Sequence, residues 1–207
     1  MLKDPIFVTR ILTISATTLA AAIALTGCSA GSSGSSMPGM NHGSSGMSAS
    51  SAPVAAGDHN AADTMFTQGM IPHHAQAVEM SDMMLKKQGI DPKVTALATK
   101  IKAAQGPEIT TMTGWLTTWN EPSQMSGGHS MTGMMGDDDL KKLDAAQSTD
   151  AAKLFLTQMI AHHQGAVMMA KTEESDGKNA DAVALSKNIV VSQQAEIQDM
   201  KDLLDTL

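Results

Sequence analysis

The chain has 207 residues, a formal net charge of −7 at neutral pH, and only 2% aromatic residues. An acidic chain lacks the basic patch that a nucleic-acid backbone requires, so a nucleic-acid partner is not expected. The unusual part of the composition is 18 methionines beside a single cysteine, Cys28, which by itself provides neither a disulfide nor a zinc cage.

The first 27 residues have the features of a targeting signal. Lys3 and Arg10 make its start weakly basic, and the apolar run at residues 11–25 is too short to span a bilayer comfortably. The run ends in Leu-Thr-Gly-Cys, which resembles a bacterial lipobox, where the cysteine is lipidated and becomes the mature N-terminus. The sequence therefore predicts an extracytoplasmic lipoprotein, anchored to the cell membrane through Cys28. The alternative is an ordinary secretory signal with a chance cysteine.

Residues 28–59 form the next segment, which is rich in Ser, Gly, Ala and Met and has almost no charge. Such a composition buries too little apolar surface to offset its ordering entropy, so it predicts a flexible tether. Residues 60–207 have the length of one ordinary domain.

The first predicted helix of the domain begins near Asn60 or Asp63 and ends at Lys87 or Gln88, before Gly89. Its apolar residues recur at a spacing of three and four, as on one face of a helix. A proline within it predicts a local kink at position 72, or alternatively a helix that starts there.

The second predicted helix has Asp91 as its N-cap and Pro92 at its first position, a favoured arrangement. It extends to about Trp119, and Gly106-Pro107 is expected to bend it in the middle. These two helices make up a first unit over residues 60–120.

A methionine-rich linker is predicted over residues 121–147. It contains a Gly/Met/Ser loop at residues 125–136 and a short helix from Asp137 to about Ala146. Two further helices follow over residues 148–207: one from Ser148 or Thr149 to Asp176, and one from about Asn179 to the C-terminus.

The two units are copies of each other. The segment Met-Ile-x-His-His-x-x-Ala-Val-x-Met begins at residue 70 and returns at residue 159, and Gln-x-x-Glu-Ile-x-x-Met begins at 105 and returns at 193. Internal repetition of a two-helix unit predicts an all-α fold, an antiparallel four-helix bundle built from two duplicated helical hairpins. A pseudo-two-fold axis would place both sets of polar residues in the middle of this bundle.

Polar residues interrupt the apolar face of every long helix. They are His73, Gln105, Glu108, His162, Gln193 and Glu196. Burial of an unpaired imidazole or carboxylate costs several kcal/mol, so these groups must bond to each other or bind a cation. In a purely hydrogen-bonded core, Glu108 and Glu196 accept from histidines, and Gln105 and Gln193 bond to each other. Two adjacent histidine pairs with methionine and glutamate at matching positions favour a metal site instead.

The donor types point to copper. Imidazole suits several transition metals, whereas thioether sulfur selects Cu(I) most sharply, and no thiolate is available. The candidate ligands are Met70, His73, His74, Met80, Glu108 and Met112 in the first copy, and Met159, His162, His163, Met169, Glu196 and Met200 in the second. Further methionines and histidines occur in the flexible segments, at Met37, Met40, His42, Met125, His129, Met131, Met134 and Met135.

Consecutive helical residues differ by about 100° in direction, so one histidine of each pair is expected at the seam and the other beside it. Glu108 and Glu196 either orient the imidazoles or bind the metal directly. Because no nucleophile–base pair or phosphate loop is visible, we expect sequestration or delivery of the metal and no enzymatic activity.

These motifs resemble the bacterial family designated domain of unknown function 305, over about residues 63–207 and including the linker. The resemblance implies a ferritin-like bundle and, for some members, copper binding and copper tolerance outside the cytoplasm. A ferritin-like fold also raises a di-metal redox protein as an alternative. Such bundles use Glu-x-x-His motifs, whereas Met70 and Met159 stand three residues before His73 and His162 here. A cell-envelope structural or interaction module without metal is the remaining alternative.

Overall fold

The structure, a computed structural model, describes residues 59–125 and 131–207. The predicted signal peptide, the lipidation site Cys28 and the tether up to residue 58 lie outside the described residues, as does His129 of the linker. Within the described part, no helix is long and apolar enough to cross a membrane.

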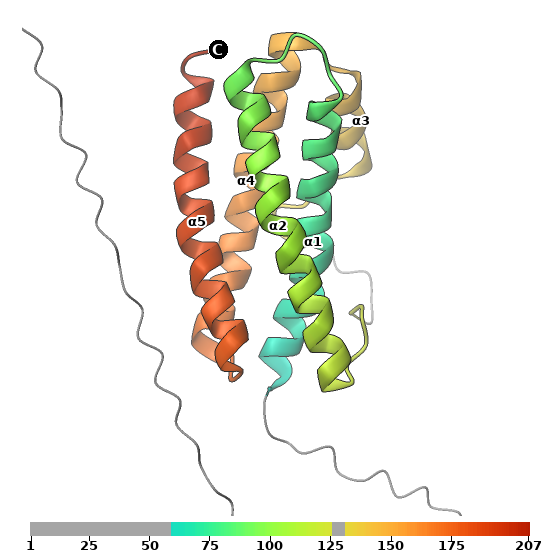
Figure 1. The fold of residues 1–207 in the computed structure, drawn as a ribbon, viewed down its shortest axis with the longest axis vertical. Coiled ribbons are helices and arrows are strands. Elements are labelled where there is room, and N and C mark those ends of the chain that lie inside the picture. The colour runs from blue at the N-terminus through green and yellow to red at the C-terminus, as the bar shows by residue number, and fades with distance from the viewer. Residues whose placement is uncertain (1–58, 126–130) are drawn as a thin grey trace, which may run out of the picture. The chain divides into compact units, whose positions relative to one another are not determined.

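Four long helices and one short helix make up the described fold (Figure 1). Their bounds are Ala61–Leu85 for α1, Pro92–Trp119 for α2, Asp137–Ala145 for α3, Ser148–Asp176 for α4 and Ala180–Leu204 for α5. α1 packs along α2 and α4 along α5, and the contact between α1 and α4 joins these two hairpins. α3 packs against α1 and α4. The predicted all-α four-helix bundle of two hairpins is confirmed.

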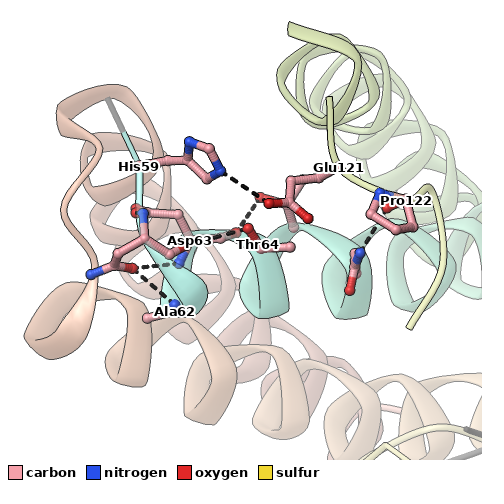
Figure 2. A network of polar contacts seen from close by, with 9 residues as sticks. His59, Ala62, Asp63, Thr64, Glu121 and Pro122 are labelled. Atoms are coloured by element: carbon pink, nitrogen blue, oxygen red, sulfur yellow. Dashed lines mark hydrogen bonds and ion pairs between the residues drawn. The ribbon is translucent and has the colours of Figure 1, made fainter. Parts of the chain in front are cut away.

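The start of α1 is held by a reciprocal cap (Figure 2). The Asn60 side chain accepts from the backbone N–H of Ala62 and Asp63, and the Asp63 carboxylate accepts from the backbone N–H of Asn60 at 2.6 Å. This capping box satisfies N–H groups that a helix start leaves unpaired. The helix therefore begins before Pro72, and the alternative in which it starts at Pro72 is wrong.

His59, directly before this cap, ties the start of α1 to the end of α2 (Figure 2). Its ring stacks on Trp119 with centroids 4.6 Å apart, and its Nε2 lies 3.3 Å from Glu121 Oε1. About two turns into α1, the Gln68 amide donates to the carbonyl of Pro122 at 2.7 Å. These contacts hold one end of the first hairpin closed.

A pair of buried carboxyl groups closes the same end of the second hairpin. Asp63 also accepts from the backbone N–H of Lys178 and of Asn179, which lie in the turn between α4 and α5. Glu173 of α4 is 1% exposed and lies beside Asp63. Burial first, and then the neighbouring Asp63 and the charge of Asp176, together raise the pKa of Glu173 to about 8. Glu173 is therefore protonated at neutral pH.

The interior of the bundle consists of two apolar clusters. The first apolar cluster contains Ala77, Met80, Met84, Val94, Leu97, Ala98, Ile101, Leu143, Ala151, Ala152, Phe155, Leu156, Met159 and Met200. The second apolar cluster contains Phe66, Met70, Met112, Ala166, Ala170 and Ile189. Each of the four long helices contributes to both clusters, and, apart from Gly165, the buried residues between its two contributions are polar.

Candidate metal centre

These polar residues form one layer, which we call the polar layer. It consists of His73, His74, Gln105, Glu108, His162, His163, Gln193 and Glu196. The four histidines are at most 1% exposed. Along every long helix the layer falls between the first and the second apolar cluster. The duplicated sequence therefore folds so that both copies deliver their polar residues to the same part of the bundle.

One histidine of each pair is bonded to a glutamate across its own hairpin. His74 Nε2 lies 2.8 Å from Glu108 Oε2, and His163 Nε2 lies 2.8 Å from Glu196 Oε2. Since an ionised carboxylate only accepts, the Nε2 atom of each ring carries the hydrogen and donates it. These bonds fix the orientation and the tautomer of the two imidazoles. They fit the first of the two predicted roles of Glu108 and Glu196, which was to orient the histidines.

The two glutamates differ in their surroundings. The Glu196 side chain is 6% exposed and is also 3.5 Å from Lys100 Nζ, whereas the Glu108 side chain is 23% exposed. Burial by itself raises the pKa of Glu196, but its bond to His163 and the nearby Lys100 outweigh burial and hold the pKa below its usual value. Glu196 is therefore ionised.

The other two histidines meet at the seam between α1 and α4. The ring centroids of His73 and His162 are 3.8 Å apart, with their planes tilted by 41°. His73 Nε2 lies 3.3 Å from the backbone carbonyl of Thr132, which only accepts, so this nitrogen donates. One histidine of each copy thus lies at the seam and the other beside it, although the flanking rings are buried as well.

Burial keeps these imidazoles neutral. Burial and, to a smaller extent, the neighbouring histidines lower the pKa of His73 to about 3 and that of His162 to about 2. The pKa of His163 is also lowered by burial, although its bond to Glu196 acts in the opposite direction. A neutral imidazole keeps a nitrogen lone pair, which is the form that binds metals.

Several of these lone pairs have no partner. The Nδ1 atoms of all four histidines are buried without a hydrogen-bond partner, and so is Nε2 of His162; in the neutral His162 ring one of these two nitrogens carries the hydrogen and the other the lone pair. The Oε1 atoms of Gln105 and Gln193 are also without a partner, so the hydrogen bond between these two glutamines, expected for a purely hydrogen-bonded core, is not formed. Buried acceptors without donors are rare in folded proteins and fit a bound cation.

The candidate methionines lie on both sides of the polar layer. Met70 and Met112 of the first copy belong to the second apolar cluster, and Met159 and Met200 of the second copy belong to the first apolar cluster. All four are fully buried. Equivalent methionines of the two copies thus lie on opposite sides of the polar layer, as a pseudo-two-fold axis through the layer would place them.

Met80 and Met169 lie farther from the histidines. Each is seven residues beyond the seam histidine of its own helix, which corresponds to about 10 Å along the axis. Met80 is fully buried in the first apolar cluster, whereas Met169 is half-buried. Their role as ligands stays a prediction.

The linker between the two hairpins covers the seam between α1 and α4, which the helical periodicity of the sequence did not predict. Besides the Thr132 carbonyl on His73, the Gln76 amide donates to the Met135 carbonyl at 2.9 Å and accepts from its N–H at 2.7 Å. Gly165 occupies the position in the second copy that Gln76 has in the first, and a Cβ there would overlap the Thr132 carbonyl. The sequence signal was a glycine inside a helix, which often marks a close backbone approach.

We expect Gly165→Ala to lower the free energy of unfolding by about 1–3 kcal/mol, because the added methyl group must displace backbone of the linker. The matched control is Gly114→Ala in α2, where a Cβ would meet nothing within 4 Å and where helix propensity predicts a gain of about 0.5–1 kcal/mol. Urea denaturation of both variants measures the effects. Equal stabilisation by both substitutions would show that the linker does not pack on Gly165.

Among the residues that the structure describes, no three or more histidine, cysteine, aspartate or glutamate side chains converge as a metal cage. The centre therefore lacks the ligand set of a structural zinc or a di-iron site. Its available donors are imidazole nitrogens, which suit several transition metals, and methionine thioethers on both sides, which favour Cu(I).

Comparison with known proteins identifies relatives of this chain. The model of the family described as Domain of unknown function (DUF305) matches residues 63–204, whereas no curated protein matches. The chain is 35% identical to a DUF305 protein of Streptomyces coelicolor that is considered to be secreted, with a TM-score of 0.67 and coverage of 70% of this chain and 93% of the other. A DUF305 fragment from Deinococcus radiodurans is 30% identical, with a TM-score of 0.66 and coverage of 72% and 99%.

The protein CopM is similar as well. In its Cu(I)-bound form it is 32% identical to this chain, with a TM-score of 0.59 and coverage of 70% of this chain and 96% of CopM. CopM structures also exist with Cu(II), with Ag and in the apo form. The fold of the described bundle thus occurs in a protein that binds copper and silver.

Proposed function

Because the chain belongs to the DUF305 family, we propose that it binds copper, as Cu(I), in the polar layer and holds it for sequestration or delivery. The observation that carries this proposal is the set of four buried Nδ1 atoms without a hydrogen-bond partner. Buried polar atoms without a hydrogen-bond partner are rare in folded proteins, and imidazole nitrogens are common metal ligands.

The resemblance to CopM supports the identity of the ion. CopM is a relative at 32% identity whose structures contain Cu(I), Cu(II) and Ag. Ag(I) and Cu(I) are both soft and monovalent, and the thioethers of Met70, Met112, Met159 and Met200 flank the histidines of this chain. His73, His162 and these methionines would hold the ion, and Glu108 and Glu196 would orient the flanking imidazoles.

A role in storage or delivery requires no catalytic group beyond the ligands. The ferritin-like di-metal redox alternative needs carboxylates that bridge two metals, whereas Glu108 and Glu196 each bond to a histidine of their own hairpin.

We further propose that the protein works outside the cytoplasm, anchored through lipidated Cys28. The lipobox-like sequence and the Streptomyces relative that is considered to be secreted support this location.

The proposal is tested on the full chain, purified without a histidine tag. We expect metal analysis to find copper after growth with copper, and Cu(I) titration against a chromophoric chelator to reveal a tight site. A ligand that binds only the native state at 100 times its Kd raises the free energy of unfolding by about 2.7 kcal/mol, so Cu(I) should raise the Tm.

The alternatives predict other results. Iron or manganese in the purified protein, together with oxygen consumption on addition of ferrous iron, would support the di-metal redox protein. A Tm that is identical with Cu(I) and with chelator would leave the polar layer as a purely structural or interaction feature and contradict the proposal.

A further inference from the structure

We propose that the bundle carries a second site for a soft monovalent cation, formed by Met125, Met131 and Met169 around Gly69. The three heavy atoms nearest to a Cβ placed on Gly69 all belong to methionine tips: Met131 Sδ at 3.5 Å, Met169 Sδ at 3.6 Å and Met125 Cε at 4.0 Å. We call this group the thioether cluster.

The thioether cluster is assembled from three separate segments. Met125 and Met131 belong to the linker, Met169 to α4 and Gly69 to α1. Because both sulfurs lie within 3.6 Å of one point, they are no more than about 7 Å apart. The side chains are half-buried, and the absent side chain of Gly69 leaves the space onto which their tips converge.

Duplication of the hairpin does not explain this arrangement. In the other copy, Gln158 occupies the position of Gly69, and its amide donates to the Asp139 carbonyl at 3.0 Å. Met80 occupies the position of Met169 and is fully buried in the first apolar cluster. The thioether cluster therefore exists in one half only, where linker methionines complete it.

The donor chemistry selects the class of ligand. Thioethers are neutral and soft, so they bind Cu(I) or Ag(I) and do not neutralise a hard divalent ion. An apolar filler role would be served equally by leucine, which conserves volume but has no lone pair to donate. The difference between methionine and leucine at these positions is therefore the measurable signature of the site.

The surroundings connect the thioether cluster to solvent and to the histidines. A groove of about 260 Å³ lies between α1 and α4, lined by Met65, Phe66 and Met169 among others, and Met65 is 58% exposed. Met65, Gly69 and His73 follow one another at intervals of four on α1, so they lie along one side of the helix. The neighbour of Met131, Thr132, contacts His73 through its carbonyl.

The thioether cluster thus lies about one helical turn from the seam histidines and beside an open groove. On the basis of the proposed function, the thioether cluster is an outer binding site for the same ion that the polar layer holds inside the bundle. All of its ligands are methionine sulfurs.

The test compares stoichiometry in matched variants of the full chain. Ag(I) is titrated in competition with a chromophoric chelator. The triple variant Met125→Leu, Met131→Leu, Met169→Leu is expected to bind one equivalent less than the unaltered chain. The control variant Met83→Leu, Met134→Leu, Met168→Leu changes three methionines of the same segments outside the cluster and should keep the full stoichiometry.

A second measurement uses the unaltered chain, so it does not depend on whether the triple variant folds. With ¹³C-labelled methionine methyl groups, Ag(I) should shift the three resonances that the single Leu variants assign to the cluster. Unchanged resonances, or an unchanged stoichiometry in a folded triple variant, would overturn the second site. If the polar layer does not bind the ion, the result differs: His73→Ala/His162→Ala then binds as much Ag(I) as the unaltered chain. This outcome would contradict the proposed function and leave the second site untouched.

Discussion

His73→Ala/His162→Ala is expected to weaken Cu(I) binding by at least about 100-fold, measured by competition with a chromophoric chelator. The two rings meet at the seam, and their buried lone pairs are the donors that no other group satisfies. Loss of a partner that only orients a ligand typically costs about 10–100-fold, so loss of two direct ligands should cost more. Glu108→Gln should fall within that smaller range if Glu108 only orients His74.

The control for this double variant is His59→Ala. His59 is also a histidine of the described bundle, but it stacks on Trp119 at the end of α2 and takes no part in the polar layer. Its removal should leave Cu(I) affinity unchanged. Tight binding that survives in His73→Ala/His162→Ala would show that the copper site lies elsewhere in the chain.

Glu173 is expected to contribute less to the stability of the bundle as the pH rises from about 5 to 9. Its pKa is about 8 in the folded protein against an ordinary value of 4.5, so the folded state binds the proton more tightly. The stabilising contribution is complete below about pH 4.5 and is lost as the pH rises through 8. A shift of this size corresponds to a few kcal/mol, since one unit is about 1.4 kcal/mol.

Glu173→Gln isolates this effect. Glutamine remains neutral, so the variant should gain stability relative to the unaltered chain as the pH rises from 5 to 9, by an amount on the order of a few kcal/mol. The buried histidines influence both proteins equally and cancel in the comparison. Urea denaturation at each pH measures the difference.

Glu174→Gln is the control for loss of one negative charge from the same turn of α4. Asp63 and Asp176 both raise the pKa of Glu173, so replacement of either should reduce the pH dependence. A difference between Glu173→Gln and the unaltered chain that does not vary with pH would contradict the raised pKa of Glu173.

The sequence predicted the bundle because its signals are local. Asn60 and Asp63 cap α1, Asp91 and Pro92 start α2, and the observed bounds agree with the predicted ones to within a few residues. The last helix ends at Leu204, three residues before the predicted end at the C-terminus, and helix ends commonly fray. Helical periodicity also placed the polar residues on the inner faces, which is sufficient to predict that they meet.

The sequence by itself therefore determined the helices, their duplication and the donor types of the centre, since each depends on spacing along one segment. Tertiary structure decided which groups bond: His74 to Glu108, His163 to Glu196, and His73 against His162. It alone brought Thr132, Gly165 and the thioether cluster together, because packing of a linker across two helices leaves no period in the sequence.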